Sequence, residues 1–347
     1  MSLETSFRRL IRQTGPMSLA RYMGEANAHY YTRGEAFGRQ GDFVTAPDVS
    51  QMFGEMVGLW CADLWQRAGR PDRIAYVELG PGRGTLAKDA LRVMARQGMT
   101  PQIHLVEGSA TLAKQQREAV PGAKVHGDLD GVPRDTPILL VANEFLDALP
   151  VRQLVLTRKG WRERMVGLDA KERFVFVAGD QPMDDAVPAD RRDQPVDTIL
   201  ETCPGAAAIV EEVALRLQSQ GGAALFIDYG TLAPQTGSTF QAARRHEKVD
   251  PLRDPGSADL TAHVDFASLE ATARTAGSDR VYATTQGAFL ERLGITARAQ
   301  ALVAAQPDRR SQIAGEHRRL CAPDAMGELF KAMALVAPDW PEPNGFA

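Results

Sequence analysis

The chain has 347 residues, of which 44% are hydrophobic and 24% charged, and its formal net charge is −4. Such a composition is typical of a soluble globular protein with one elaborated domain or two smaller ones. The small negative charge argues against a general binder of nucleic acid or of anionic membranes, and no apolar run approaches the roughly 18 residues of a membrane-spanning helix. The three cysteines and six histidines show no C-x-x-C or H-E-x-x-H pattern, so we expect a reducing compartment and no metal site.

Residues 1–72 precede the first predicted strand of the main sheet, and we expect them to form an N-terminal helical cap. The basic segment Met1–Gly15 has the charge of a mitochondrial presequence, but it contains a glutamate and continues directly into the amphipathic segment Met17–Tyr31. A docking helix of the folded domain is therefore the better interpretation. A loop at 41–48 then leads into a helix over about 49–68, whose apolar stripe predicts core packing.

The next stretch alternates between short apolar runs and helical segments. We predict strands at 74–79, 102–107, 124–126 and 137–142, with helices at about 85–97 and 109–119. Strands that alternate with helices imply a mostly parallel sheet, wound right-handedly, with ligands at the carboxyl ends of its strands. The expected fold class is therefore α/β, with a Rossmann-like sheet.

Two insertions interrupt this winding. Over about 151–200 the pattern changes to antiparallel strands followed by a polar connection rich in Asp and Pro, and the polar stretch 231–263 has the length of a loop that closes over a binding site. Around these insertions we predict a helix at 205–219, a strand at 223–228, a helix at 264–275, a strand at about 280–286, helices within 288–320 and a strand at 329–336. The last two strands are expected to close the sheet as an antiparallel pair, so that residues 73–347 form one domain.

A glycine-rich segment, Glu78-Leu79-Gly80-Pro81-Gly82-Arg83-Gly84, follows the first strand and precedes a helix that begins near Thr85. Alternate glycines let the backbone turn sharply and come close to a ligand. The spacing differs from the G-x-G-x-x-G of dinucleotide folds, and the lysine of a phosphate-binding loop is missing. An acid followed by G-x-G-x-G resembles the first motif of class I S-adenosylmethionine-dependent methyltransferases, in which the turn holds the methionine end of the cofactor. We therefore expect Glu78, Gly80, Gly82, Gly84 and Thr85 to bind S-adenosylmethionine; a plain turn with incidental glycines is the alternative.

Two further acids lie where the adenosine end of such a cofactor would be bound. Glu107 ends the second strand, and a carboxylate there can accept hydrogen bonds from both ribose hydroxyls. Asp128 follows the third strand, where methyltransferases of this class usually place an acceptor for the adenine amino group. A surface acid at a strand end and a turn-forming aspartate are the respective alternatives.

Asn143, Glu144 and Asp147 follow the strand at 137–142, at the edge where the reaction is expected. If the following residues begin a helix, Glu144 and Asp147 share one face of it. They can then grip a guanidinium from the same side and stabilise the charge that grows as a methyl group arrives. Capping of a helix start by the two acids is the alternative.

Five segments together resemble the MidA family. They read GDFVTAPDVSQMFGE at 41–55, ELGPGRGTL at 78–86, NEFLDALPV at 143–151, IDYG at 227–230 and DLTAHVDF at 259–266. The similarity spans nearly the whole chain, from about Arg12 to Pro338. Mitochondrial members of the family are arginine methyltransferases needed for assembly of respiratory complex I. The resemblance therefore implies a class I fold with inserted elements, and symmetric dimethylation of an arginine in a core subunit of complex I.

Two other functions are compatible with these residues: a methyltransferase that acts on a small molecule, and an assembly chaperone that binds S-adenosylmethionine only structurally. A broad acidic cleft favours a peptide acceptor, whereas a closed aromatic pocket favours a small one. The expected partner is a protein substrate, without nucleic acid and without membrane insertion. The oligomeric state, a homodimer included, is left open, and the weak presequence character favours the cytoplasm of a bacterium.

Overall fold

The computed structural model describes residues 2–32, 44–244 and 247–346. Its first helices are α1 (Leu3–Thr14) and α2 (Leu19–Thr32), with the short strand β1 (Met17–Ser18) between them. Of the loop expected at 41–48, residues 41–43 lie outside the described residues. The end of that loop forms the short helix α3 (Ala46–Val49), which was not expected. The helix expected over about 49–68 is α4 (Gln51–Arg67); it begins after Ser50, which has an extended backbone and whose hydroxyl accepts a hydrogen bond from the Met52 N–H.

The main sheet has eight strands, and seven of them follow the order β15-β16-β10-β5-β2-β3-β4. These strands are β2 (Ala75–Leu79), β3 (Gln102–Val106), β4 (Lys124–His126), β5 (Ile138–Asn143), β10 (Gly222–Thr231), β15 (Val281–Thr285) and β16 (Phe330–Val336), and β14 (Val264–Asp265) pairs with the end of β10. Only β16 runs against its two neighbours, β10 and β15. The predicted α/β fold, mostly parallel with an antiparallel closing pair, is confirmed.

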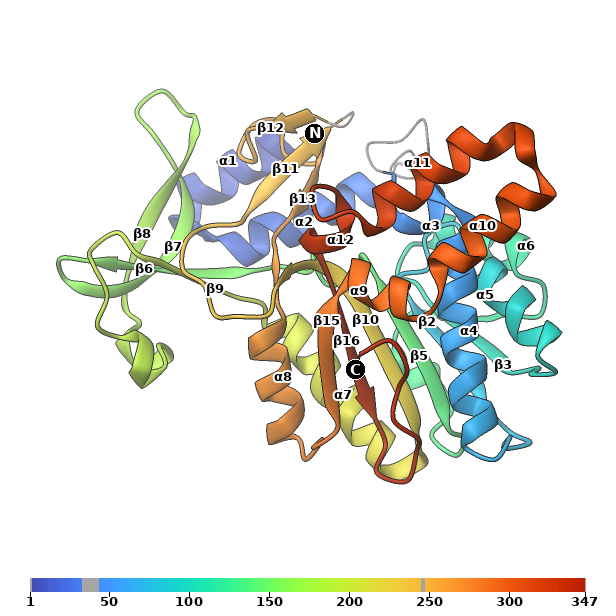
Figure 1. The fold of residues 1–347 in the computed structure, drawn as a ribbon. Coiled ribbons are helices and arrows are strands. Elements are labelled where there is room, and N and C mark those ends of the chain that lie inside the picture. Colours follow the sequence, from blue (N-terminus) through green and yellow to red (C-terminus); the bar gives the residue numbers. More distant parts are fainter. Residues whose placement is uncertain (1, 33–43, 245–246, 347) are drawn as a thin grey trace.

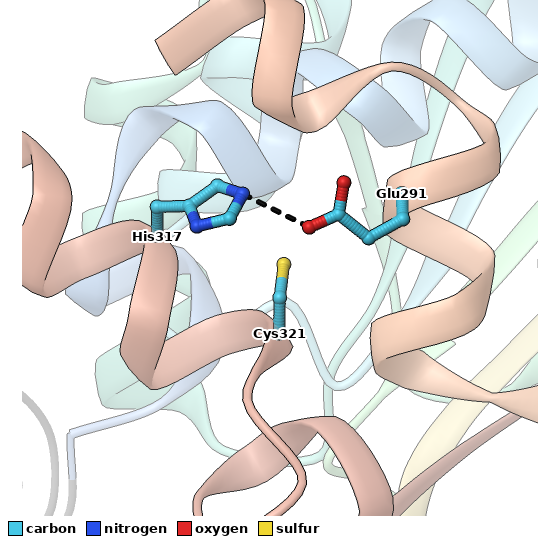
Figure 2. A group of neighbouring side chains, drawn as sticks. All are labelled: Glu291, His317 and Cys321. Atoms are coloured by element: carbon cyan, nitrogen blue, oxygen red, sulfur yellow. Dashed lines mark ion pairs between the residues drawn. The ribbon is translucent and has the colours of Figure 1, made fainter.

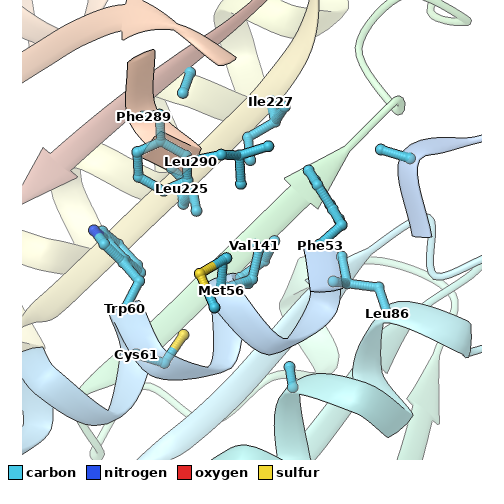
Figure 3. Packing of buried hydrophobic residues seen from close by; sticks show 14 of the residues in the cluster. Phe53, Met56, Trp60, Cys61, Leu86, Val141, Leu225, Ile227, Phe289 and Leu290 are labelled. Carbon is cyan, nitrogen blue, oxygen red and sulfur yellow. The ribbon is translucent and has the colours of Figure 1, made fainter. Parts of the chain in front are cut away.

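Helices cover both faces of this sheet (Figure 1). They are α5 (Thr85–Arg96), α6 (Ala110–Ala119), α7 (Pro204–Gln220), α8 (Phe266–Thr275), α9 (Gln286–Arg292), α10 (Ile295–Ala305), α11 (Arg310–Cys321) and α12 (Met326–Leu329). On one face α4 packs against α5 and the strands, where Trp60, Leu225 and Phe289 belong to one buried cluster (Figure 3). On the other face α7 and α8 cover Phe226 and its neighbours. None of the helices in the described part of the chain combines the length and the hydropathy of a membrane span.

The N-terminal helices α1 and α2 belong to a different hydrophobic cluster from α4. Phe7 and Tyr22 pack there with Val166 and Leu260, which come from the two insertions. The domain boundary expected after residue 72 stays a prediction. Because α4 packs with the main sheet, a boundary closer to Ala46 is favoured.

The first insertion forms the antiparallel strands that were predicted. These strands are β6 (Arg152–Thr157), β7 (Gly160–Leu168), β8 (Phe174–Pro182) and β9 (Ile199–Thr202), and β1 adds to the edge of β7. Strand β9 lies at the end of the stretch expected to be a polar connection. It pairs with β6, which lies more than forty residues earlier in the chain. The residues next to β9 in the sequence therefore do not predict this pairing.

The second insertion contains a small antiparallel sheet, which the analysis of its polar sequence did not predict. Its strands are β11 (Gln241–Arg244), β12 (Glu247–Val249) and β13 (Asp259–Thr261). The buried Asn27 side chain of α2 donates to the Leu260 carbonyl at 2.8 Å and accepts from the Leu260 N–H at 3.0 Å. Figure 1 shows this sheet beside α1 and α2. Closure of this segment over a ligand stays a prediction.

Close contact between α4 and α5 depends on glycine at position 58. A Cβ there would lie 2.5 Å from the Ala90 carbonyl oxygen and 2.7 Å from the Ala90 Cα, both backbone atoms of α5. Gly58→Ala should therefore force the helices apart and lower the free energy of unfolding by about 1–3 kcal/mol. Gly315→Ala in α11, where a Cβ meets nothing within 4 Å, should leave stability unchanged or raise it by about 0.5–1 kcal/mol. Denaturant unfolding of both variants checks this, and an equal effect in the two would contradict it.

Candidate active site

The order of the strands reverses between β2 and β5, which are parallel neighbours. From β2 the sheet continues to β3 and β4, and from β5 it continues to β10. In such open sheets the ligand lies at the carboxyl ends of the two strands where the winding reverses. The glycine turn follows β2 and the Asn143–Asp147 segment follows β5, so the topology brings these two predicted sites together. A pocket there is lined from three sides by Gly80, Gly82, Thr85, Asn143, Glu144 and Pro47 of α3.

The glycine turn has a backbone that other residues adopt only with strain. Gly80, Gly82 and Gly84 have φ angles of 60°, 52° and 80°, all in the left-handed region. A Cβ at Gly80 would also lie 2.5 Å from Cδ2 of Phe145. Gly80 is therefore required by the packing of the segment after β5 as well as by the turn. Gly84 precedes α5, whose first N–H groups, from Thr85 on, have no partners within the helix.

Glu78 is buried at the end of β2 and lines the pocket. The Tyr76 hydroxyl donates a 2.6 Å hydrogen bond to Glu78 Oε2. Burial raises the pKa of Glu78 to about 7, and the Tyr76 hydrogen bond lowers it less than burial raises it. A positively charged ligand in the pocket would favour the ionised form of this side chain.

Glu107 follows β3, and both of its carboxylate oxygens are held by the protein. Oε1 accepts from the Ser109 N–H at 2.8 Å, and Oε2 accepts from Gln116 Nε2 at 3.0 Å. The same Gln116 amide donates to the Gly82 carbonyl at 2.8 Å, so the buried Gln116 ties Glu107 to the glycine turn. Sequence analysis missed Gln116; a glutamine on the otherwise apolar inner face of α6 was the available signal.

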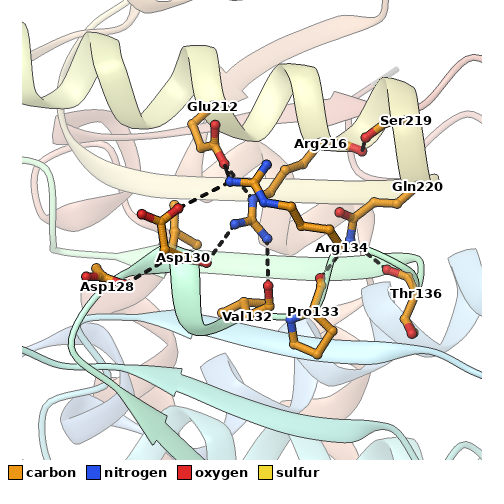
Figure 4. Close-up of polar contacts among 11 residues, drawn as sticks. Asp128, Asp130, Val132, Pro133, Arg134, Thr136, Glu212, Arg216, Ser219 and Gln220 are labelled. Carbon is orange, nitrogen blue, oxygen red and sulfur yellow. Dashed lines mark hydrogen bonds and ion pairs between the residues drawn. The ribbon is translucent and has the colours of Figure 1, made fainter.

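Asp128 is exposed, and its Oδ1 accepts a 3.0 Å hydrogen bond from the Asp130 N–H. This is the turn-forming role that was the alternative, and contact with adenine stays a prediction. The loop after Asp128 is fixed from α7 by Arg216, which is 1% exposed and donates to the carbonyls of Leu129 at 2.6 Å and Val132 at 3.1 Å (Figure 4). Arg216 is a second positioning residue that the sequence did not reveal.

The segment after β5 is a turn and not the helix start that was expected. The buried Asp228 of β10 holds it, since its Oδ2 accepts from the N–H groups of Phe145, Leu146 and Asp147 at 3.1, 3.0 and 3.2 Å. Burial and the nearby carboxylates raise the pKa of Asp228, and these N–H bonds act against the rise. The hypothesis that Glu144 and Asp147 share one helical face is therefore wrong.

Glu144 has a φ angle of 49°, which is uncommon for a residue with a side chain. Such strain is found most often at functional sites, where the surrounding structure enforces it. Glu144 Oε1 accepts from the Ala46 N–H of α3 at 2.7 Å and from Asn143 Nδ2 at 3.1 Å. Asn143 is 8% exposed, and its Oδ1 has no hydrogen-bond partner among the described residues. Burial, with a smaller contribution from Asp147, raises the pKa of Glu144 to about 7.

Asp147 is buried, more so than Glu144, and has different surroundings. Burial raises the pKa of Asp147 to about 6, and a hydrogen bond from the Tyr229 hydroxyl lowers it by a smaller amount. Tyr229 stacks edge-on against His263 with ring centroids 5.3 Å apart. Glu144 therefore faces α3 and the pocket, whereas Asp147 is held by β10.

The sheet order and the glycine turn at its switch point define a class I methyltransferase. Residues 56–284 match the family described as S-adenosyl-L-methionine-dependent methyltransferase. The mitochondrial protein arginine methyltransferase NDUFAF7 of Xenopus laevis is 37% identical over 94% of this chain and 82% of that protein, and the Homo sapiens protein of the same name is 36% identical over 94% and 81%. This chain belongs to that family of S-adenosylmethionine-dependent methyltransferases.

Solved structures support the same assignment. A Burkholderia thailandensis protein with bound S-adenosyl-homocysteine is 29% identical and superposes with a TM-score of 0.85, covering 99% of this chain and 94% of that one. A native crystal structure from the same organism gives a TM-score of 0.82 at the same identity, over 99% of this chain and 95% of that one. S-adenosylmethionine is therefore the cofactor.

The residues at the switch point fit S-adenosylmethionine, which carries positive charge on its sulfur and its amino group. The pocket offers the buried carboxylate of Glu78 to these charges, and the Asn143 Oδ1, which has no partner among the described residues, also lies at the pocket. The guanidinium of Arg83, which pairs with Asp48 at 3.0 Å, lines the pocket and suits the carboxylate of S-adenosylmethionine. Which atoms each predicted residue contacts stays a prediction.

Replacement of two residues tests the cofactor site. Gly82→Val should abolish binding, because a β-branched residue cannot adopt φ 52° without strain, while the sheet stays folded. Glu107→Ala should weaken binding by about 1–3 kcal/mol through the unpaired ribose hydroxyls. Glu118→Ala, which removes an exposed acid of α6, is the matched control. Calorimetric titration with S-adenosylmethionine measures all three, and unchanged affinity in both test variants would remove these residues from the site.

Proposed function

We propose that this enzyme methylates a guanidino nitrogen of an arginine in a protein substrate, and that the substrate is a core subunit of respiratory complex I. The observation that carries the proposal is Glu144, a half-buried carboxylate on left-handed backbone that lines the cofactor pocket. The relatives named protein arginine methyltransferase support the arginine acceptor. The complex I subunit, its symmetric dimethylation and a role in assembly rest on the MidA resemblance.

S-adenosylmethionine, when bound, supplies a methyl group on a positively charged sulfur that is an excellent leaving group. The protein has mainly to align the acceptor with that methyl group and to exclude water. The glycine turn, Glu78 and Glu107 hold the cofactor in this proposal. Asn143 and Glu144 hold the acceptor, because both line the pocket next to the turn.

The charge of Glu144 suits a guanidinium. A guanidinium stays protonated in proteins, so catalysis depends on orienting one nitrogen and balancing its charge. A guanidinium beside Glu144 would favour the carboxylate form of that side chain against the effect of burial. Asn143 Oδ1, which lacks a partner, can accept one guanidinium N–H and so help to fix which nitrogen faces the methyl group.

The pocket is less suited to the alternatives. Its described lining contains no aromatic residue and includes three acids, Asp48, Glu78 and Glu144, which favours a cationic acceptor over a flat apolar one. A purely structural cofactor site would not need Glu144 at the rim of the pocket. A bacterial cytoplasmic location, which the three scattered cysteines suit, is part of the proposal.

Glu144→Gln keeps the shape and the hydrogen-bond acceptor that faces Ala46 but removes the charge. We expect unchanged cofactor affinity and a loss of about 2–4 kcal/mol of transition-state stabilisation in methyl transfer to an arginine peptide. Asp147→Asn should have a smaller effect, because Asp147 is held by β10. With saturating cofactor, the rate of the wild type should rise with pH as Glu144 ionises, and this rise should lie below about 7, the pKa of Glu144 without ligand, because the positive charge of the cofactor favours the carboxylate; the rise should be absent in Glu144→Gln. Single-turnover assays measure both, and full activity of Glu144→Gln would exclude this residue from the mechanism.

The substrate is tested in cells. Mass spectrometry of complex I subunits should find one dimethylated arginine in a core subunit of the wild-type strain and an unmodified arginine in a strain that lacks this gene. The wild-type gene should restore the modification, and a gene encoding Glu144→Gln should not. Identical methylation with and without the gene would exclude complex I as the substrate while leaving the methyltransferase assignment intact.

A further inference from the structure

A cluster of three potential metal ligands lies outside the cofactor site. Glu291 comes from α9, and His317 and Cys321 come from α11. Positions four apart on a helix share one face, so His317 and Cys321 both point towards α9. Figure 2 shows the imidazole, the carboxylate and the sulfur converging on one point between the two helices. A search for paired histidines or cysteines in the sequence does not detect this set, because the third residue comes from another helix.

The distances suit a small ion. One ligand atom from each residue lies within 4.8 Å of the other two, and His317 Nε2 is 3.0 Å from Glu291 Oε1. Zinc bonds of roughly 2.0–2.3 Å place the ligand atoms of a tetrahedral ion roughly 3.3–3.7 Å apart. Small side-chain rotations are therefore enough to form the site.

Thr296 at the start of α10 supports the carboxylate. Its hydroxyl lies 2.6 Å from Glu291 Oε2, the oxygen that does not pair with His317, and 2.9 Å from His317 Nε2. A hydrogen bond to the outer oxygen of a ligating carboxylate orients that carboxylate and leaves the other oxygen for the metal. The arrangement thus resembles a metal ligand with its supporting partner.

We propose that Glu291, His317 and Cys321 bind one Zn²⁺ or similar divalent transition-metal ion. A sulfur, an imidazole nitrogen and a carboxylate oxygen form a donor set that zinc accepts and that magnesium and calcium do not favour. Three protein ligands leave a fourth position for water. On binding, the ion displaces the thiol proton to solvent and replaces the contact between His317 Nε2 and Glu291 Oε1, so that the imidazole is neutral and carries its proton on Nδ1. The groove between α10 and α11, which His317 lines together with Val303 and Ile313, gives the ion access from solvent.

The position of the cluster indicates a stabilising role. Glu316, next to His317 on α11, accepts a 2.7 Å hydrogen bond from the Ser50 hydroxyl, which caps α4 directly after α3. The Ala46 N–H of α3 in turn donates to Glu144. An ion that fastens α11 to α9 therefore braces the wall of the cofactor pocket from outside, at a distance from the transferring methyl group.

Cobalt(II) serves as the spectroscopic probe. We expect the chelator-treated protein to bind one Co²⁺ per chain with a thiolate-to-cobalt charge-transfer band, and Zn²⁺ to displace it. Cys321→Ser should lose the band. Cys203→Ser, which alters another partly buried cysteine, should keep it. Glu291→Gln, a change at an exposed position, should weaken Co²⁺ binding at least about tenfold and should not disturb folding.

Thermal unfolding provides a second measurement that does not depend on activity. Zn²⁺ should raise the melting temperature of the wild type and of Cys203→Ser, and it should leave Glu291→Gln and His317→Gln unaffected. Absence of a charge-transfer band in the wild type would overturn the proposal. So would a band that persists in Cys321→Ser, or one that disappears in Cys203→Ser.

Discussion

The Asp228 carboxylate is the contact on which the active site depends. It lies on β10, yet it accepts the N–H groups of three consecutive residues of the turn after β5. These hydrogen bonds satisfy the three N–H groups outside any helix. They hold the residues that directly follow Glu144, whose backbone is left-handed. They also seat Phe145 against Gly80, so that the glycine turn and the reaction edge fit each other. Loss of this one carboxylate would release both sides of the pocket.

The second constraint is charge. Glu78 and Asp147 are buried carboxylates and Glu144 is a half-buried one, and removal from water raises the pKa of each. Holding such groups in the empty protein is costly, and a cationic ligand relieves that cost by favouring their ionised forms. Both the sulfonium of the cofactor and a guanidinium acceptor have the required sign. The electrostatics of the pocket therefore favour the same pair of ligands that the family relationship suggests.

Local sequence patterns predicted the strands and helices of the main sheet closely. The strand at 74–79, the glycine turn and the helix from Thr85 all form as expected, because each depends on neighbouring residues: apolar runs, left-handed glycines and a free helix start. The antiparallel end of the sheet was also predicted, from the strand expected at about 280–286 and the apolar run at 329–336. The residues of the two pocket walls, Gly80 to Gly84 and Asn143 to Glu144, were likewise identified from their places after strands.

The tertiary structure decided what local patterns could not. The acids at positions 144 and 147 suit the start of a helix, but Asp228, 81 residues beyond Asp147, accepts the N–H groups of this segment and holds it as a turn. The polar stretch 231–263 forms strands that pair with one another, and Asn27 of α2 holds one of them at Leu260. Gln116 acquires its role only when α6 packs beside the glycine turn and bonds the Gly82 carbonyl. The sequence by itself therefore determined the elements of the main sheet and the cofactor turn, because these depend on neighbouring residues, and hydrogen bonds between separate segments determined the geometry of the site.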